Sequence, residues 1–308
     1  MGKLLIVGSL AFDSIETPFG KTEKTMGGAA NYISIAASQF TTESAVVSVV
    51  GNDYPKDFLD TLEARNINIS GVEVKPNGKT FFWSGKYHND MNTRDTTETQ
   101  LNVLLDFKPI VPEDFQQPDI LMLGNLHPSV QLEVLSQMTQ TPKLVVLDTM
   151  DYWMNHTWDL LMQVIKRVNI VTINDQEARQ LSKEYSLVKA AQKIMQMGVD
   201  YVVIKKGEHG ALLFHNESVF FAPALPLEEV FDPTGAGDTF AGGLVGYLAK
   251  TEDYSFENIK NAVIYGANLA SFCVEKFGTE RMLSLTKSEI CNRLLQFKAL
   301  TQFEIEIT

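Results

Sequence analysis

Short apolar runs recur along the chain and alternate with stretches of helical period. The runs LVVLD, NIVTIN and YVVIK are β-branched and apolar on both faces, which is typical of strands covered by helices on each side. Their alternation with helices predicts a doubly wound α/β fold, a mostly parallel sheet flanked by helices. We expect strands at residues 4–7, 45–50, 120–123, 144–147, 169–173 and 201–204. We expect helices at about residues 28–39, 54–65, 129–139, 174–182, 187–197, 236–250, 256–275 and 286–297.

Two stretches, residues 13–26 and 72–104, do not follow this rhythm, because Gly, Thr, charged and aromatic residues mix in them without a helical period. The second contains Asn77-Gly78 between strand-like runs, which predicts a hairpin since both residues tolerate positive φ. Loops of this length in a compact domain are usually structured or functional. We therefore expect a single domain over residues 1–308, with the two stretches forming a small β-sheet lid inserted into it.

Composition and charge exclude some classes of protein. The 308 residues include 26 basic and 38 acidic side chains, and the net charge of −12 disfavours nucleic acid as a partner. Cys273 and Cys291 form neither a CxxC pair nor a cluster with histidine, so neither a disulfide framework nor a zinc site is expected. No apolar run is long enough for a signal peptide or a membrane span, and we expect a cytoplasmic protein without membrane partners.

The strongest chemical signal is the glycine-rich turn at residues 232–238, which runs directly into an apolar helix. Gly235, Ala236 and Gly237 have small side chains, so backbone N–H groups at the helix start can approach an anion such as a phosphate. Asp238 follows in the first turn, where it could accept a proton from a hydroxyl beside that anion. The alternative is a plain turn in which Asp238 only favours the helix dipole.

Other nucleotide-binding motifs fail at a required position. Gly20-Lys21-Thr22 and Gly78-Lys79-Thr80 end like a P-loop, but Ile15 and Glu73 stand where the first glycine is needed. A dinucleotide fingerprint from Gly235 would need glycine at the position of Phe240. Neither a P-loop nor a Rossmann dehydrogenase is therefore indicated.

Polar residues also stand where ligands bind in open α/β sheets, at the ends of predicted strands. Asp13 follows the first strand, and its carboxylate could accept two hydroxyl protons from a ligand, unless it is only a turn residue. Asn125 and His127 follow the strand that ends LMLG. Because His127 precedes Pro128, a turn role is favoured for it over catalysis.

Asn174 and Glu177 are three residues apart, so on a helix they share one face and could order a hydrated Mg²⁺. The same spacing is also that of a helix-capping pair, and both interpretations can hold together. Lys205, Gly207 and Gly210 mark a strand end and a tight turn.

The string DPTGAGDTFAGG, residues 232–243, resembles the C-terminal signature of the ribokinase-like (PfkB) carbohydrate kinases, in their sugar and nucleoside kinase branch. LLIVGSLAFD resembles the family's first strand and substrate aspartate, and MGGAANYISIAAS its glycine-rich N-terminal signature. INDQEA is similar to its Asn-x-x-Glu motif, and VIKKGEHGALLF to its nucleotide-binding strand and turn. The sequence departs from the pattern at Ala29, where many members have glycine, and bulky Tyr32 and Ile33 follow Asn31.

This resemblance implies a ribokinase-like fold, ATP with Mg²⁺ as cofactors, and a role for each matching residue. Asp238 would be the catalytic base and Gly235, Ala236 and Gly237 would hold the transferred phosphate. The residues expected at the substrate are Asp13, Gly27, Gly28, Asn31, Arg94 and Asn125. Those expected at the nucleotide are Asn174, Glu177, Lys205, Gly207, Gly210 and Asn268. Glu177 would bind Mg²⁺ through water, and Asp232 and Thr234 match positions that help to bind K⁺ in some relatives.

The sequence thus predicts an ATP-dependent kinase that phosphorylates a primary hydroxyl of a small sugar or nucleoside. The aromatic lid and the branch resembled favour a nucleoside. The alternative is a catalytically silent sugar or nucleoside sensor with the same fold, because a fold alone does not determine function. Since lid sheets form dimers in some relatives, a homodimer through the lid is also a candidate.

Overall fold

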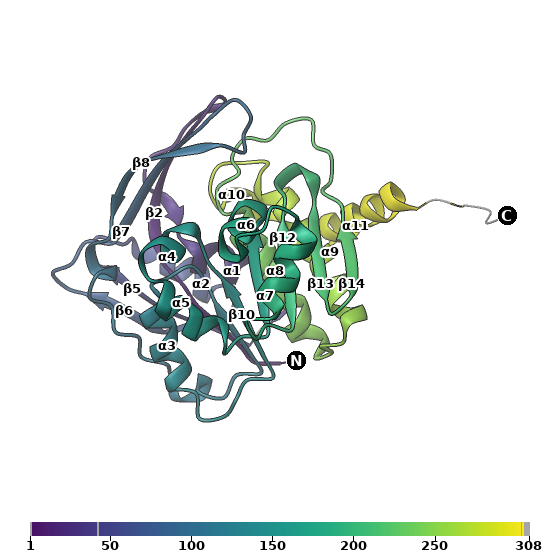
Figure 1. Ribbon diagram of the computed structural model, residues 1–308. Helices are drawn as coiled ribbons and strands as arrows, with labels where there is room; N and C mark the ends of the chain where they lie inside the picture. Colours follow the sequence, from purple (N-terminus) through teal and green to yellow (C-terminus); the bar gives the residue numbers. More distant parts are fainter. Residues whose placement is uncertain (1, 42, 303, 305–308) are drawn as a thin grey trace.

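The computed structural model describes residues 2–41, 43–302 and 304 (Figure 1). Nine strands of this described chain form the main sheet, in the order β14-β13-β12-β11-β10-β9-β1-β5-β6. The strands from β12 to β6 in this order are parallel, and β13 and β14 are antiparallel at one edge. Their bounds are β1 Leu4–Val7, β5 Ser44–Gly51, β6 Ile67–Lys75, β9 Ile120–Leu123, β10 Leu144–Asp148, β11 Ile170–Asn174, β12 Tyr201–Lys205, β13 Ala211–His215 and β14 Ser218–Ala222. Each predicted strand is present, and the predicted doubly wound fold is confirmed.

Both faces of this sheet are apolar, because successive residues of a strand point to opposite sides. Leu4 and Ile6 belong to one buried cluster, and Leu5 and Val7 to the other. The first cluster contains residues of α1, α2, α8, α9 and α11, and the second contains residues of α3, α5, α6 and α7. The helices are α1 Ala29–Ala37, α2 Lys56–Glu63, α3 Pro128–Ser136, α4 Asp151–His156, α5 Trp158–Ile165, α6 Asp175–Ser182, α7 Leu187–Met195, α8 Ala236–Thr251, α9 Phe256–Cys273, α10 Glu280–Ser284 and α11 Lys287–Thr301. Over the part of the chain that is described, no helix has the length and apolar character needed to cross a membrane.

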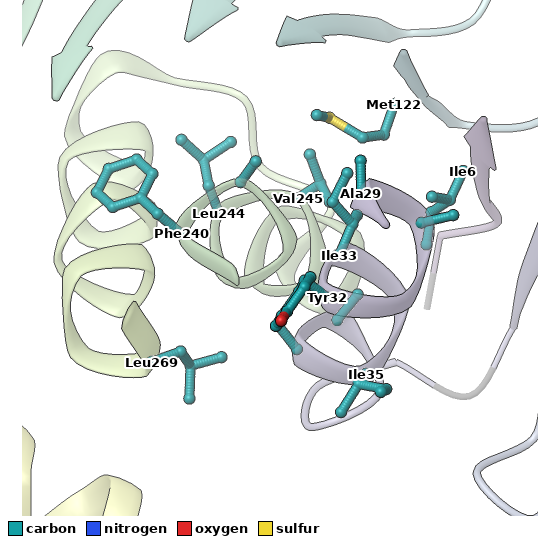
Figure 2. Close-up of a cluster of buried hydrophobic side chains, with 14 of the residues drawn as sticks. Ile6, Ala29, Tyr32, Ile33, Ile35, Met122, Phe240, Leu244, Val245 and Leu269 are labelled. Atoms are coloured by element: carbon teal, nitrogen blue, oxygen red, sulfur yellow. The ribbon is translucent and has the colours of Figure 1, made fainter. Parts of the chain in front are cut away.

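Close packing of α8 against its neighbours sets the position of the glycine-rich turn. Figure 2 shows Val245 of α8 beside Ile33 of α1, and Leu244 of α8 belongs to the same buried cluster. A Cβ on Gly242 would lie only 2.3 Å from the carbonyl oxygen of Ile33, so the two helix backbones can approach this closely only with glycine there. Gly242 and Gly243, the second pair of glycines in the motif, are therefore needed for helix packing. This packing fixes the position of the first turn of α8 relative to the sheet.

A second, five-stranded sheet stands beside the main one (Figure 1) and is here called the lid sheet. Its strand order is β3-β2-β7-β8, with β4 also paired to β2. The bounds are β2 Ala11–Thr17, β3 Gly20–Lys21, β4 Thr25–Gly27, β7 Phe81–Tyr87 and β8 Arg94–Gln100. The two predicted stretches thus come together in one sheet, although residues 72–75 complete β6 of the main sheet.

The predicted hairpin at Asn77-Gly78 is wrong. A tight turn is present, with the Gly78 N–H donating to the Lys75 carbonyl at 3.2 Å, but it connects strands of different sheets. β6 pairs with β5 of the main sheet, whereas β7 pairs with β2 and β8 of the lid sheet. Turn chemistry is local, whereas the strand with which each arm pairs depends on distant parts of the chain. Two hairpins lie within the lid sheet instead, one formed by β2 and β3 and the other by β7 and β8.

Candidate active site

The predicted site residues gather where the lid sheet faces the carboxyl ends of the parallel strands. β10, β11 and β12 end at Asp148, Asn174 and Lys205, and Asn125 follows β9 closely. Because parallel strands have their carboxyl ends at one edge, these side chains share that edge. The first turn of α8 lies there too, since Gly237 is close to Lys205.

Asp13 is enclosed by backbone. It lies on β2, its side chain is 4% exposed, and a Cβ on Gly27 would lie 2.1 Å from its carboxyl carbon. Burial raises the pKa of Asp13 to about 7, although a hydrogen bond from the Gly28 N–H lowers it. Gly28 itself has φ 87° and lies against the Ser9 carbonyl, so both glycines of the N-terminal signature are required by geometry.

Asn31 is fully buried beneath this loop. Its amide nitrogen donates to the Gly27 carbonyl and, at 3.0 Å, to the hydroxyl of Tyr54. Within the described residues its amide oxygen has no hydrogen-bond donor. Asn31 therefore braces the glycine loop, and it keeps one buried acceptor free for another group.

The glycine-rich turn has the conformation expected of an anion site. Gly235 is the N-cap of α8 with φ 74°, and a Cβ there would lie 2.3 Å from the ring of Tyr32. Among the described side chains none caps this helix start. The Ala236 N–H donates to the Pro233 carbonyl at 3.2 Å, so the next N–H groups, those of Gly237 and Asp238, face the space where the helix dipole favours an anion.

Asp238 lies in this first turn, half-buried and surrounded by charge. Burial and the nearby Asp148 carboxylate raise its pKa to about 7, while Lys205 and Arg94 lower it. A carboxyl group with a pKa near neutrality is well suited to accept a proton during a reaction. The geometry thus places a candidate base directly beside the anion site.

The sequence analysis missed Asp148, although this residue stands at the end of the apolar run LVVLD. Its position resembles that of Asp13, which follows the first strand. The Asp148 carboxylate forms an ion pair with Lys205 at 2.5 Å, and Thr172 Oγ1 donates to the same oxygen at 2.8 Å. The strand-end rule applied to Asp13 and Asn125 would have found it.

Asn174 and Glu177 form the capping box that their spacing predicts. The Glu177 N–H donates to Asn174 Oδ1, and the Asn174 N–H donates to Glu177 Oε2, each at 2.8 Å. Burial raises the pKa of Glu177 to about 7, and Lys205 lowers it. The capping interpretation is confirmed, and the Mg²⁺ role stays a prediction.

The turn after β12 meets the tip of the lid sheet. Gly207 and Gly210 have φ values of 53° and 78°. A Cβ on Gly207 would lie 2.8 Å from Asn92 Oδ1, and Asn92 also donates to Glu208 at 3.4 Å. These contacts connect residues 90–94 of the lid sheet to the predicted nucleotide turn.

Arg94 extends from the lid sheet toward the two aspartates. Its guanidinium lies 5.6 Å from the ring centroid of Trp83, and its charge lowers the pKa of both Asp13 and Asp238. Burial raises the pKa of Tyr87 and the Arg94 charge lowers it, and the Tyr87 hydroxyl accepts from Thr234 Oγ1 at 3.1 Å. Tyr87 is one of the aromatic residues of the predicted lid, and this hydrogen bond joins the lid sheet to the glycine-rich turn.

Asp232 is fully buried and anchors that turn. Its carboxylate accepts from the Thr234 N–H at 2.9 Å and from the Gly278 N–H at 2.8 Å. Burial raises the pKa of Asp232. The carboxylate oxygens serve the backbone, and the predicted K⁺ role of Asp232 and Thr234 stays a prediction.

The remaining predicted residues have structural contacts. Asn125 Oδ1 accepts from the indole of Trp153 at 2.7 Å, at the strand edge. His127 caps α3 by accepting from the Ser129 N–H, as its turn role predicted. Asn268 is fully buried and donates to the Ile290 carbonyl at 3.4 Å, so its nucleotide role requires movement and stays a prediction.

The fold and the site together define the class of protein, an α/β phosphotransferase with an anion site beside a candidate base. Residues 1–286 match the family described as pfkB family carbohydrate kinase. The chain therefore belongs to the pfkB family of carbohydrate kinases, as the sequence motifs indicated.

Relatives and solved structures agree. The cytidine kinase of Thermococcus kodakarensis is 32% identical over 255 residues, which are 79% of this chain and 88% of that protein. The crystal structure of the Methanocaldococcus jannaschii nucleoside kinase has a TM-score of 0.77 at 22% identity, covering 96% of this chain and 99% of that one. The Burkholderia thailandensis nucleoside kinase in complex with inosine also has a TM-score of 0.77, at 20% identity, covering 98% and 100%. The predicted activity is confirmed at this level: an ATP-dependent kinase that acts on a sugar or nucleoside with a divalent metal.

Proposed function

We propose that this kinase transfers the γ-phosphoryl group of ATP to a primary hydroxyl of a nucleoside, with Mg²⁺ as the divalent ion. The observation that carries the proposal is the Asp238 carboxylate in the first turn of α8, with a pKa raised to about 7 beside uncapped helix N–H groups. The preference for a nucleoside is supported by the similarity to a cytidine kinase.

The acceptor is held by the groups around Asp13. A carboxylate accepts hydrogen bonds from two neighbouring hydroxyls, as on a ribose ring. The unpaired Asn31 amide oxygen is a further acceptor nearby. Phe12, Tyr54 and Phe58 form an aromatic group behind this loop, with Phe12 and Tyr54 centroids 5.5 Å apart.

In the reaction, Asp238 accepts the proton of the attacking hydroxyl. The acceptor oxygen bonds to the γ-phosphorus, the bond from that phosphorus to the β,γ-bridging oxygen breaks, and ADP leaves. The N–H groups of Gly237 and Asp238 face the developing charge, together with Lys205 and Arg94. Positioned donors of this kind supply much of the catalysis of phosphoryl transfer.

The residues at the strand ends fit a Mg²⁺ ion held mainly by phosphates and water. Mg²⁺ usually keeps several waters and meets one or two carboxylates, and Glu177 offers one beside Lys205. When bound, the ion neutralises charge on the phosphates. Asp232 and Thr234 are the candidates for K⁺ at the base of the glycine-rich turn.

The lid sheet excludes water from the transfer. Thr234 donates a hydrogen bond to the Tyr87 hydroxyl, and Asn92 donates one to Glu208. The lid sheet thus contacts both the glycine-rich turn and the nucleotide turn. Exclusion of water prevents hydrolysis of ATP in place of transfer. A homodimer through the lid sheet and a cytoplasmic location stay predictions.

A coupled assay of ADP release tests this function. The acceptor panel contains cytidine, other nucleosides, ribose, fructose derivatives and inositols, each with Mg²⁺ and with or without K⁺. We expect the highest kcat/KM with a nucleoside. A sugar as the best acceptor would contradict the nucleoside proposal, and binding without ADP release would favour the sensor.

Activity is expected to depend on pH through the two aspartates. Burial raises the pKa of Asp13 and of Asp238 to about 7, and each acts as a carboxylate. The kcat/KM for the acceptor therefore falls as the pH decreases through about 7. In a plot of log kcat/KM against pH the slope approaches about 2 at low pH, because two protons bind. A flat profile between about pH 5.5 and 8, with the fold intact by circular dichroism, would contradict both roles.

Removal of the divalent ion is expected to weaken ATP binding. The chain has a net charge of −12, and Asp148, Glu177 and Asp238 lie near the expected phosphates. One uncompensated charge contact near a protein surface is worth several kcal/mol before screening, so ATP with EDTA should bind at least about tenfold more weakly than ATP with Mg²⁺. Calorimetric titration measures both, and equal affinities would contradict the account.

A further inference from the structure

The ion pair between Asp148 and Lys205 bridges two strands that are not neighbours. Asp148 ends β10 and Lys205 ends β12, with β11 between them. Thr172 of β11 is opposite Asp148 in the register and donates to Asp148 Oδ2 at 2.8 Å. The Thr172 hydroxyl therefore fixes Asp148 Oδ2, which lies 2.5 Å from Lys205 Nζ.

This pair is largely removed from solvent. Its side chains are 17% exposed for Lys205 and 11% exposed for Asp148. Taking two charges out of water is unfavourable, and apolar residues of similar volume often stabilise a fold as well or better. The stability of the fold alone does not account for the pair, and the position of the ammonium is the more informative feature.

The Lys205 ammonium lies at the first turn of α8. A Cβ built on Gly237 would be 3.1 Å from Lys205 Nζ, so a side chain at that position would meet the ammonium. Lys205 also lies close enough to Glu177 and Asp238 to lower the pKa of each. Three carboxylates thus surround the ammonium, and of the described residues only Asp148 forms an ion pair with it.

Loss of Asp148 would leave the ammonium with two other carboxylates. The lysine side chain has a flexible four-carbon stem, so it can turn toward whichever charge remains. Pairing with Asp238 would occupy the base, and pairing with Glu177 would withdraw the ammonium from the helix start. In both cases the ammonium no longer has the fixed position beside Gly237 that its ion pair with Asp148 gives it.

We propose that Asp148 is a positioning residue that holds the Lys205 ammonium at the N-terminus of α8, where it binds the transferred phosphate of ATP. This proposal rests on the proposed function in its use of ATP, and it assigns Asp148 an effect that passes through Lys205.

A double-mutant cycle on ATP binding tests the proposal. The dissociation constant of ATP with Mg²⁺, without acceptor, is measured by calorimetry for Asp148→Asn, Lys205→Met and the double variant. We expect Lys205→Met to weaken binding about 30-fold, since a charge-assisted contact to phosphate is lost. Asp148→Asn should weaken it about tenfold, and the double variant should match Lys205→Met within about twofold.

Several results would overturn it. If the double variant weakens binding by the product of the single effects, roughly 300-fold, Asp148 acts independently of Lys205, for instance on the metal. Unchanged or tighter binding by Asp148→Asn would mean that its charge only repels ATP. Unchanged binding by Lys205→Met would remove the phosphate contact.

Stability provides a second readout, because Asp148→Asn leaves a buried ammonium without its partner. We expect a lower thermal midpoint for Asp148→Asn that the double variant recovers, while ATP binding by the double variant stays weak. Recovery of both would contradict the proposal. Asp119→Asn is the matched control. Asp119 is ion-paired to Lys143 at 2.8 Å and directly precedes β9, so it lies at the amino ends of the parallel strands, away from the site. The Asp119→Asn variant should therefore bind ATP normally.

Failure of this proposal and failure of the proposed function are distinguishable. If no acceptor supports ADP release from the unmodified chain, the proposed function fails, while the binding cycle still measures the coupling of Asp148 to Lys205. If turnover is normal and the cycle is additive, only the role of Asp148 fails.

Discussion

Asp238→Asn is expected to lower kcat by roughly 10² to 10⁴ while the affinity for ATP with Mg²⁺ changes little, because the amide cannot accept the proton of the attacking hydroxyl. The asparagine has nearly the same shape and keeps the first turn of α8 intact. Initial rates of ADP release and a calorimetric titration of ATP measure the two quantities separately.

The same substitution is not expected to unfold the protein. The pKa of Asp238 is raised to about 7 by burial, so above that pH the folded state holds an ionised group in an unfavourable environment. Removing this charge leaves the thermal midpoint unchanged or raises it at about pH 8. Glu257→Gln is a matched control, since Glu257 is an exposed acid in the first turn of α9, and it should retain full turnover. Near-normal turnover of Asp238→Asn would exclude the carboxylate as the base.

Asp13→Asn is expected to lower kcat/KM for the acceptor by roughly 10² to 10⁴ and to leave the KM for ATP nearly unchanged. Two hydroxyl hydrogen bonds to a buried carboxylate are weakened together, and each is worth about 1.5–3 kcal/mol. Steady-state kinetics with each substrate varied in turn measure the effect. An equal loss for ATP and acceptor would mean that Asp13 shapes the whole site and not the acceptor alone.

Gly27→Ala tests the same contact from the backbone side. The added Cβ would lie 2.1 Å from the carboxyl carbon of Asp13, so the carboxylate has to move. We expect the same selective loss toward the acceptor as in Asp13→Asn. Glu16→Gln is the matched control. Glu16 lies on the same strand as Asp13 and is an exposed ion-pair partner of Lys86, so its replacement should leave both KM values unchanged.

The glycine motifs could be identified from the sequence because their requirement is local. Gly235 needs a left-handed φ to begin α8, and Gly27 and Gly28 wrap backbone around Asp13 within about fifteen residues of chain. The capping box of Asn174 and Glu177 is likewise a contact of three residues' separation. For such features, residue type and spacing are sufficient.

Contacts between distant segments could not be predicted in this way. Tyr87 and Thr234 are 147 residues apart, and Asp148 and Lys205 are 57 apart. No spacing rule relates them, because they meet only through the strand order of the main sheet and the placement of the lid sheet over it. The wrong hairpin at Asn77-Gly78 has the same origin, since a local turn signal does not determine which strand each arm joins.

The sequence by itself determined the buried parallel strands, the helices between them, the glycine-rich turn with Asp238, and the pfkB family. These depend on periodicity and on backbone freedom at single positions, which adjacent residues control. Only the tertiary structure decided the electrostatics of the site: burial that raises the pKa of Asp13, Glu177 and Asp238 to about 7, and the lysine held among three carboxylates. Desolvation and charge–charge interactions depend on distances through space, and the order of the strands together with the placement of α8 and the lid sheet sets those distances.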